Sequence, residues 1–284
     1  MIKCVKRKEL AVVKYDACIE NAIQSRIYAF SWYLDIVADN WDVLVLNDYE
    51  AVMPIPWKQK YFIKYVTQPF FCQQLGVFSV QKISKELVLN FTQKIPNNFF
   101  RISLSLNSDN ILFLEKTRRK NYILRLFNEY TEIQKGFSKG RKHAVKVGEK
   151  AKLKLYNVTI EKLLEIQNKN YTYQIPEMIL RNLTKAFLQN EKGEVLGVFK
   201  GEKLLGGGFF IGSKNRFIYL YSAFNEEGRK LQAASFLISS IIKQHQNSNL
   251  ILDFEGGNLP NIGKFYRSFG AEEEIYSTFN KAFL

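Results

Sequence analysis

Residues 249–271 read NLILDFEGGNLPNIGKFYRSFGA, and this stretch decides the fold. Its apolar run predicts a strand that ends on two carboxylates, Asp253 and Glu255, and on a pair of glycines. A short amphipathic helix is expected next, with Gly270 at its end. The apolar positions at helical spacing are Ile262, Phe265, Tyr266 and Phe269. The pattern therefore places a tyrosine on a helix packed beside the acidic end of a strand.

This arrangement resembles the C-terminal part of the GNAT superfamily of acyl-CoA N-acyltransferases. The last helix of that superfamily often carries an asparagine early and a tyrosine eight residues later, and here these are Asn258 and Tyr266. The DFEGG turn and the FYRSFG segment look still more like the FemAB-like, two-domain branch. In many peptidoglycan-bridge aminoacyltransferases of that branch a lysine follows the phenylalanine, whereas Tyr266 stands there in this chain.

Length and composition favour two packed domains. The chain has 284 residues, of which 46% are hydrophobic and 14% aromatic, enough apolar material for two cores. Helical and strand patterns mix in both halves, which predicts an α/β protein of mixed α+β layers. The resemblance implies tandem GNAT-like acyl-CoA N-acyltransferase domains, each a mixed, mostly antiparallel sheet flanked by helices. We expect an N-terminal domain over 1–127, a basic connecting segment over 128–150 and a C-terminal acyltransferase domain over 151–284.

Neither a membrane span nor a secretion signal is predicted. The longest apolar helical candidate, Leu231–Ile242, covers about 12 residues and is interrupted by serines, whereas a bilayer needs roughly 20. Near the N-terminus, Glu9 and Lys14 interrupt the apolar run that a signal peptide needs. We therefore expect a cytoplasmic protein without a transmembrane segment, and its oligomeric state stays open.

The cysteines and histidines do not predict a site. Cys4, Cys18 and Cys72 are odd in number and unclustered, and only His143 and His245 accompany them. A disulfide framework and a zinc site both lack their residues in this pattern, and nothing local supports a catalytic Cys/His pair. We expect buried or incidental thiols and no metal.

The formal net charge of +14 would attract polyanions. The phosphates of coenzyme A, an RNA backbone and an anionic membrane face are all candidates, and a lysine-rich solvated surface is the alternative. The cations are densest within 128–152, where Lys139, Lys142, His143 and Lys146 would share one face of a helix. FemAB-like proteins have a similar basic stretch, so this helix is either a solvated connection or a contact for RNA or phosphate.

In GNAT proteins, the loop before the long helix binds the pyrophosphate of the donor through backbone N–H groups and the helix N-terminus. The family consensus is Gln or Arg, two residues, Gly, one residue, then Gly or Ala. Arg229 and Ala234 match its ends, but Gln232 occupies the central glycine position, where a side chain can block close approach. The resemblance implies these cofactor-binding candidates: Gly228, Arg229, Lys230, Leu231, Gln232, Ala233, Ala234 and Asn258.

Amide formation from a thioester needs a deprotonated amine, a stabilised oxyanion and a protonated thiolate. Tyr266 is the candidate acid, because the ordinary pKa of a phenol, near 10, suits donation to a thiolate. Asp253 and Glu255 are the candidate bases, since open sheets usually bind ligands at the carboxyl ends of their strands. The structural alternatives are a core tyrosine, an Asp253 that caps the turn, and a Glu255 paired with Arg267 or Lys264.

The resemblance thus implies an N-acyltransferase that moves an acyl group from acyl-CoA, as co-substrate, to an amine of a small molecule or peptide. One alternative is a FemAB-like transferase that uses aminoacyl-tRNA, which the basic surface favours and the missing lysine at Tyr266 disfavours. A second alternative is a non-catalytic RNA-binding or scaffolding protein on the same fold, whose donor loop has decayed at Gln232.

Overall fold

The structure, a computed structural model, describes residues 1–110, 112 and 117–282. The chain divides into two compact units, Met1–Arg119 with Ile275–Leu284 (unit 1) and Lys120–Glu274 (unit 2). The division falls inside the strand Arg118–Arg125, earlier than the boundary near residue 127 that the sequence suggests. The reason is that Ile123–Arg125 pairs with a strand of unit 2.

Unit 1 is built on a sheet with the order β1-β2-β3-β4-β6-β13, to which β5 adds beside β3. Neighbouring strands are antiparallel except for the parallel pair β4 and β6. The strands are β1 (Ile2–Lys6), β2 (Asn40–Leu46), β3 (Ala51–Lys60), β4 (Ile63–Thr67), β5 (Phe78–Ser79), β6 (Arg101–Leu106) and β13 (Glu272–Ala282). The helices are α1 (Val12–Asn21), α2 (Ser31–Val37) and α3 (Lys85–Gln93), with short 3-10 turns η1 (Arg7–Glu9) and η2 (Ile27–Ala29).

Alternation along the strands of unit 1 gives its sheet two apolar faces. One face packs on α3, where Val88 and Phe91 join a buried cluster with Met53 and Ile55 of β3. β3 and β5 also contact α1, which buries Ile19 among the aromatic residues of this end of the chain. The fully buried aromatic side chains that precede β2 are Tyr15, Tyr28 and Tyr33. The aromatic-rich sequence is therefore core material rather than a binding surface over this stretch.

Unit 2 has the sheet order β7-β12-β11-β10-β9-β8, antiparallel except for the parallel pair β11 and β12. Its strands are β7 (Arg118–Arg125), β8 (Lys154–Asn157), β9 (Gly193–Lys200), β10 (Lys203–Ser213), β11 (Arg216–Phe224) and β12 (Ile251–Asp253). Its helices are α4 (Tyr130–Lys135), α5 (Lys139–Lys150), α6 (Ile160–Asn170), α7 (Glu177–Gln189), α8 (Glu226–Lys230), α9 (Ala233–Gln244) and α10 (Pro260–Arg267).

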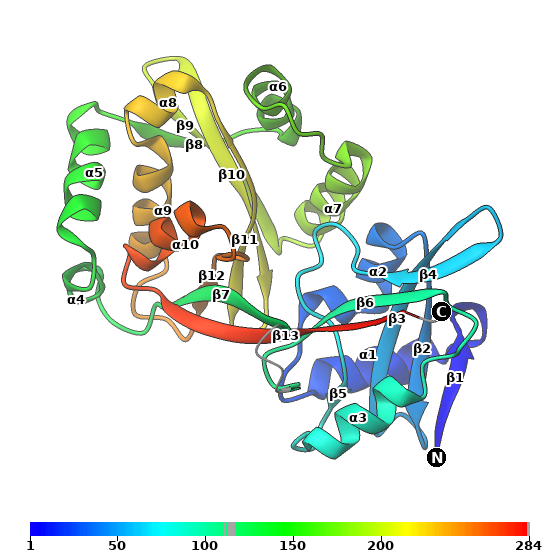
Figure 1. The fold of residues 1–284 in the computed structure, drawn as a ribbon. Coiled ribbons are helices and arrows are strands. Elements are labelled where there is room, and N and C mark those ends of the chain that lie inside the picture. Colours follow the sequence, from blue (N-terminus) through cyan, green and yellow to red (C-terminus); the bar gives the residue numbers. More distant parts are fainter. Residues whose placement is uncertain (111, 113–116, 283–284) are drawn as a thin grey trace. The chain divides into compact units, whose positions relative to one another are not determined.

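Helices cover both faces of the unit 2 sheet (Figure 1). On one face, α9 supplies Leu237 and Ile241 to a buried cluster that α5 joins through Val145. On the other, α6 and α7 pack on β9, β10 and β11, and the rings of Phe187 and Phe209 meet edge to face at 6.3 Å. A mixed, mostly antiparallel sheet between helices is the architecture that the sequence predicts, and the structure confirms it.

The central strand β10 carries three consecutive glycines, for which the sequence suggests a bulge or a close approach. A Cβ on Gly207 would lie 2.0 Å from the Leu196 carbonyl oxygen of β9. Gly206 has a φ of +147°, and the pairing with β9 shifts register beside it. The glycines therefore let the backbones of neighbouring strands approach closely at a bulge.

Candidate functional site

The candidate site lies where β12 leads into α10. β12 is buried between β7 and β11, and the chain then turns sharply with a positive φ at Glu255 (51°) and Gly257 (148°). A Cβ on Gly257 would lie 2.5 Å from the ring of Tyr122, so only glycine fits there. α10 starts at Pro260, whose fixed φ and missing N–H suit the first turn of a helix. The turn is therefore compact and leads α10 back over the end of its own strand.

Asp253 is the buried anchor of this turn. Its carboxylate accepts hydrogen bonds from Arg216 Nη1 at 2.6 Å and from Asn121 Nδ2 at 2.9 Å. The backbone N–H of Glu255 also donates to it, at 3.0 Å. Burial acts to lower the pKa of Arg216, but the charges of Asp253 and Glu274 outweigh it and raise that pKa above its ordinary value. The acidic end of β12 is thus held by a buried network of charges and hydrogen bonds.

Tyr266 lies on α10 against the same turn. Its half-buried ring stacks on Phe254, with the ring centroids 4.6 Å apart and the planes inclined by 22°. A Cβ on Gly256 would lie 3.5 Å from the Tyr266 ring, which places the turn directly against it. Burial raises the pKa of Tyr266, and the negative charges of Glu255 and then Asp253 raise it further. The phenol therefore stays protonated at neutral pH, within the field of both carboxylates.

The pairing between the neighbouring strands ends at the turn that carries Asp253. β11 and β12 pair from Arg216 and Ile251 to Ile218 and Asp253, after which β12 ends and β11 continues to Phe224. Tyr219, the next residue of β11, is buried. Its pKa is raised, mainly by burial and to a smaller extent by the nearby Tyr266. The sequence did not single out Tyr219, because it reads as one more apolar position of a strand.

A cavity of about 520 Å³ adjoins the connection between α6 and α7, lined by residues from Asn168 to Glu177. Tyr171, in its wall, accepts a hydrogen bond from the Phe224 N–H at 3.1 Å and donates to the Phe224 carbonyl at 3.3 Å. Arg229 Nη1 donates to the same carbonyl at 2.7 Å, and its guanidinium lies 5.7 Å above the Tyr171 ring. Tyr171 thus links the wall of the cavity to Arg229 of the predicted donor loop.

The predicted donor loop is the junction of α8 and α9. Gly228 lies inside α8, where its N–H donates to Asn225 Oδ1 at 2.8 Å. Lys230 pairs with Glu226 on the exposed side, and Leu231 ends α8. Gln232 then has a φ of +58°, the left-handed conformation for which glycine is preferred, and α9 begins with Ala233 and Ala234.

Arg141 of α5 reaches the start of α9. Its Nη1 donates to Ser235 Oγ and its Nε donates to Ser268 Oγ at 2.8 Å, so it links α9 to the end of α10. The guanidinium also lies 4.2 Å from the Phe265 ring centroid and 4.6 Å from that of Phe269. Burial lowers the pKa of Arg141 to about 10. Among the ion pairs of the described residues, none involves Arg141. The sequence gives Arg141 only as one member of the basic segment.

The predicted site residues therefore form two groups. The catalytic candidates Tyr266, Asp253 and Glu255 meet at the turn between β12 and α10. Asn258 belongs to this group and not to the donor loop, because its Oδ1 accepts the Lys120 N–H of β7 at 3.0 Å. The other cofactor-binding candidates, Gly228 to Ala234, lie at the junction of α8 and α9.

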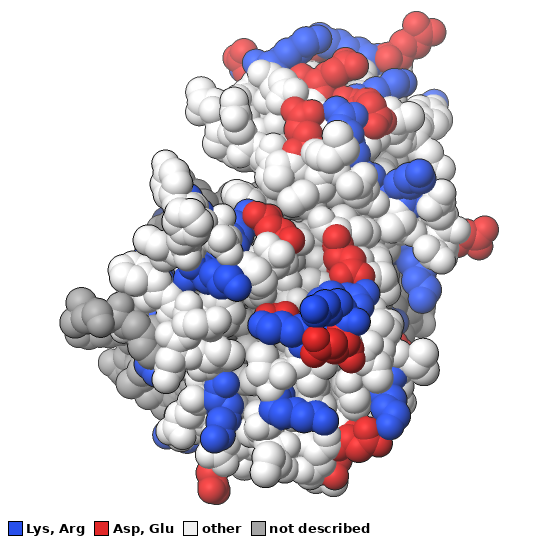
Figure 2. Space-filling view, turned by 90° about the vertical axis from the view of Figure 1, so that its right-hand side faces the viewer, with Lys and Arg blue, Asp and Glu red and all other residues white. Residues whose placement is uncertain are grey.

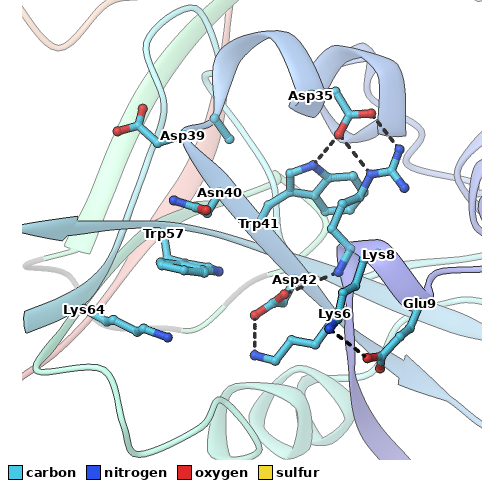
Figure 3. Close-up of a pocket in the computed structure, with 12 residues that line it drawn as sticks. Lys6, Lys8, Glu9, Asp35, Asp39, Asn40, Trp41, Asp42, Trp57 and Lys64 are labelled. Carbon is cyan, nitrogen blue, oxygen red and sulfur yellow. Dashed lines mark hydrogen bonds and ion pairs between the residues drawn. The ribbon is translucent and has the colours of Figure 1, made fainter. Parts of the chain in front are cut away.

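Unit 1 contains a separate hollow of about 680 Å³ (Figure 3). Its charges are largely paired, since Arg7 binds Asp35 at 2.7 Å and Lys6 binds Asp42 at 2.7 Å. Trp41 adds an N–H hydrogen bond to the same Asp35 at 2.8 Å. These pairs fix the ends of β1 and β2 and do not resemble the strand-turn-helix site of unit 2.

Over the described residues, the structure has neither a single-sign charge patch on the face that Figure 2 draws nor a metal-binding cluster. On the face drawn in Figure 2, lysine and arginine side chains are interspersed with carboxylates rather than gathered into one patch. In the part of the chain that the structure describes, no group of three or more His, Cys, Asp or Glu side chains is placed to hold a metal ion. Within the same residues, every helix is too short or too polar to cross a bilayer.

Comparison with known proteins identifies the fold. Residues 155–260 match the model of the acetyltransferase (GNAT) domain. The solved structure of FemX superposes with a TM-score of 0.68 at 11% identity and covers 96% of each chain. A tandem GNAT protein from the clavulanic acid biosynthesis pathway gives 0.56 at 10% identity, covering 99% of this chain and 98% of that one. No curated protein matches the chain significantly.

These findings confirm the predicted resemblance. A conserved protein of unknown function from Bacteroides thetaiotaomicron also shares the fold, with a TM-score of 0.58 at 11% identity over 99% of this chain and 100% of that one. The chain has the GNAT fold in its FemAB-like, two-domain form. The family match covers α6 to β12 and ends at Pro260, the first residue of α10, so β7 and Tyr266 lie outside the matched residues.

Proposed function

We propose that this GNAT-fold protein is an N-acyltransferase, with its catalytic groups at the turn between β12 and α10. The observation that carries the proposal is the position of Tyr266, a protonated phenol under the charges of Glu255 and Asp253, beside the point where the pairing of β11 with β12 ends. The carboxyl ends of neighbouring parallel strands, here β11 and β12, are a usual place for a ligand.

We assign the base role to Glu255 rather than Asp253. Asp253 is committed to Arg216, Asn121 and a backbone N–H, so its role is to fix the turn. Glu255 is half-buried beside Tyr266, where it can accept the proton of the attacking amine directly or through a water molecule.

Tyr266 acts as the acid of the proposed reaction. The amine attacks the thioester carbonyl, the tetrahedral oxyanion forms, and the C–S bond breaks with transfer of a proton to the departing thiolate. The raised pKa keeps the phenol protonated but makes it a weaker acid than an ordinary phenol, so its contribution comes mainly from the hydrogen bond that it donates, which becomes stronger as charge develops on oxygen or sulfur.

The acyl donor is proposed to bind at the start of α9. The first N–H groups of a helix have no intrahelical acceptor, and the helix dipole favours an anion there. Arg141 adds a positive charge at the same end through its contact with Ser235. The pyrophosphate of an acyl-CoA is the expected occupant, and an amine in a small molecule or peptide is the expected acceptor.

Melting temperature and thiol release test this function together. Acetyl-CoA and longer acyl-CoAs should raise the melting temperature in a concentration-dependent way, because a ligand that binds only the folded state stabilises it. Incubation with a panel of amines should then release free coenzyme A. If no acyl-CoA shifts the melting temperature and no amine promotes thiol release, acyl-CoA is not the donor.

Transfer from aminoacyl-tRNA is the second candidate. The observation that favours it is the exposed cationic face of α5, with Lys139, Lys146 and Lys150 in solvent beside α9. Stabilisation by charged tRNA but not by acyl-CoA, with aminoacyl transfer to an amine, would support this donor. Binding of tRNA that is steeply salt-dependent and without transfer would indicate a non-catalytic RNA-binding protein.

A further inference from the structure

The hairpin of β3 and β4 in unit 1 exposes large apolar side chains at its tip. Tyr61 is 82% exposed, Phe62 is 96% exposed and Ile63 is 52% exposed. Lys60 pairs with Ile63, so Tyr61 and Phe62 form a two-residue turn, and Figure 1 shows the hairpin extending outward from the strands of unit 1. Monomeric proteins seldom leave such a cluster in water unless it serves an interaction.

The turn itself has unusual residues. Tight hairpins favour Asn-Gly or Asp-Gly because their central residues need a positive φ. Here Tyr61 has a φ of +53°, a conformation that an aromatic residue adopts only at a cost in free energy. At Tyr61 an aromatic residue therefore occupies a position for which backbone geometry favours glycine or a small polar residue, and both Tyr61 and Phe62 are largely exposed to solvent.

A second strand widens the apolar surface. The Phe100 N–H donates to the Lys64 carbonyl oxygen at 2.8 Å, and the Phe100 side chain is 59% exposed. Arg101 follows it and pairs with Tyr65 of β4. We refer to Tyr61, Phe62, Ile63 and Phe100 as the aromatic tip.

The chain segment that forms the aromatic tip is rich in cations, of which Lys58 pairs with Asp39 at 3.0 Å. Between Ala51 and Ser108 the sequence has one carboxylate, Glu86. The same segment has seven cations: Lys58, Lys60, Lys64, Lys82, Lys85, Lys94 and Arg101. Lys60 and Lys64 flank the tip, and each ammonium lies over an aromatic ring, at 5.9 Å from Tyr61 and 4.7 Å from Trp57. Lysines can extend their stems past apolar groups and keep the charge at an anionic surface.

We infer that the aromatic tip docks this protein onto an anionic lipid bilayer. Aromatic and aliphatic side chains at the end of a hairpin can enter the boundary between headgroups and acyl chains, while flanking lysines bind lipid phosphates. A nucleic acid fits less well, because single strands bind in grooves whose aromatic rings stack on bases, whereas this surface is a projection that includes an isoleucine. The inference concerns unit 1 and holds whether or not unit 2 transfers acyl groups.

Sedimentation of the full chain with vesicles tests the inference. Vesicles of phosphatidylcholine alone should retain little protein, and vesicles with about one third phosphatidylglycerol should sediment it, with weaker binding at high salt. The double variant Phe62→Ser with Ile63→Ser should lower the partition coefficient about tenfold or more, since it removes the inserting groups. Lys60→Glu with Lys64→Glu should abolish the preference for anionic vesicles.

Phe127→Ser is the matched control, because Phe127 is a 46% exposed phenylalanine of unit 2 that should not affect vesicle binding. Unchanged melting temperatures should show that all variants fold. The inference is overturned if the wild-type chain does not bind anionic vesicles, or if the serine double variant binds them as well as wild type. It is also overturned if the aromatic tip is needed for binding RNA and not vesicles.

Discussion

Replacing Arg216 with methionine should destabilise unit 2 by about 3–5 kcal/mol, because two carboxylates would remain buried without their cation. The side chains of Arg216 and Asp253 are 11% and 2% exposed, and that of Glu274 is 11% exposed, so water cannot replace the lost charge. A domain is usually stable by about 5–15 kcal/mol, so the loss is a large part of the total. The effect should be greatest in β11 and β12, which the network joins.

Two probes distinguish the units in this experiment. All three tryptophans, Trp32, Trp41 and Trp57, lie in unit 1, so their fluorescence follows its unfolding by urea. Amide hydrogen exchange in β11 and β12 follows unit 2. Lys135→Met is the control, because it removes an ion pair with side chains 71% and 54% exposed and should cost no more than about 0.5 kcal/mol. If Arg216→Met and Lys135→Met were equally mild, the network would not be what holds the turn.

Three further outcomes are expected. Gln232→Gly should stabilise the protein by about 1 kcal/mol, as a rise in melting temperature, because glycine tolerates the φ of +58°; a lower melting temperature would argue against strain at this position. Arg141→Met should weaken acyl-CoA binding about tenfold by calorimetry, since it removes a charge at the start of α9, whereas Lys139→Met on the same helix should change it little. The free energy of unfolding should fall as the pH rises above about 10. The tyrosines of the unfolded chain ionise in that range, whereas Tyr219 and Tyr266, whose pKa values are raised in the folded protein, remain protonated. A urea midpoint that stays constant to higher pH would contradict this prediction.

Much of unit 2 follows from local sequence signals. Apolar periodicity and Pro260 predict α10 within a few residues of its observed bounds, and the apolar run before Asp253 predicts β12. The apolar helical candidate Leu231–Ile242 corresponds to α9, which is observed over Ala233–Gln244 and starts later because Gln232 adopts the left-handed conformation.

Unit 1 is harder to predict from its sequence. Some of its strands pair with residues that are distant in the chain, and one of its tight turns has none of the residues that usually mark a turn. β6 pairs with β13 through residues 101–106 and 277–282, and no local pattern announces such a pairing. The extension of β3 to Lys60 and the return along β4 were not expected, since the turn at Tyr61 contains neither glycine nor asparagine.

The sequence indicates which residues lie at the candidate site, but it does not indicate which role each of them has. The turn residues Asp253 and Glu255 were both candidate bases, and only the partners of Asp253 distinguish them. Arg216 is 37 positions away from Asp253, so its ion pair could not be inferred from spacing. In the sequence, Arg141 is one of many positive charges in the basic segment. Only its contact with Ser235 in the structure distinguishes it from the others.

The most direct test of the proposed function is the turnover of Tyr266→Phe with an acyl-CoA and an accepted amine. This change removes one hydroxyl and keeps the ring that stacks on Phe254, so the fold and the donor KM should be preserved. We expect kcat to fall about 100-fold or more, which is the usual contribution of a positioned acid. A kcat equal to that of the wild-type protein would show that the phenol takes no part in the reaction.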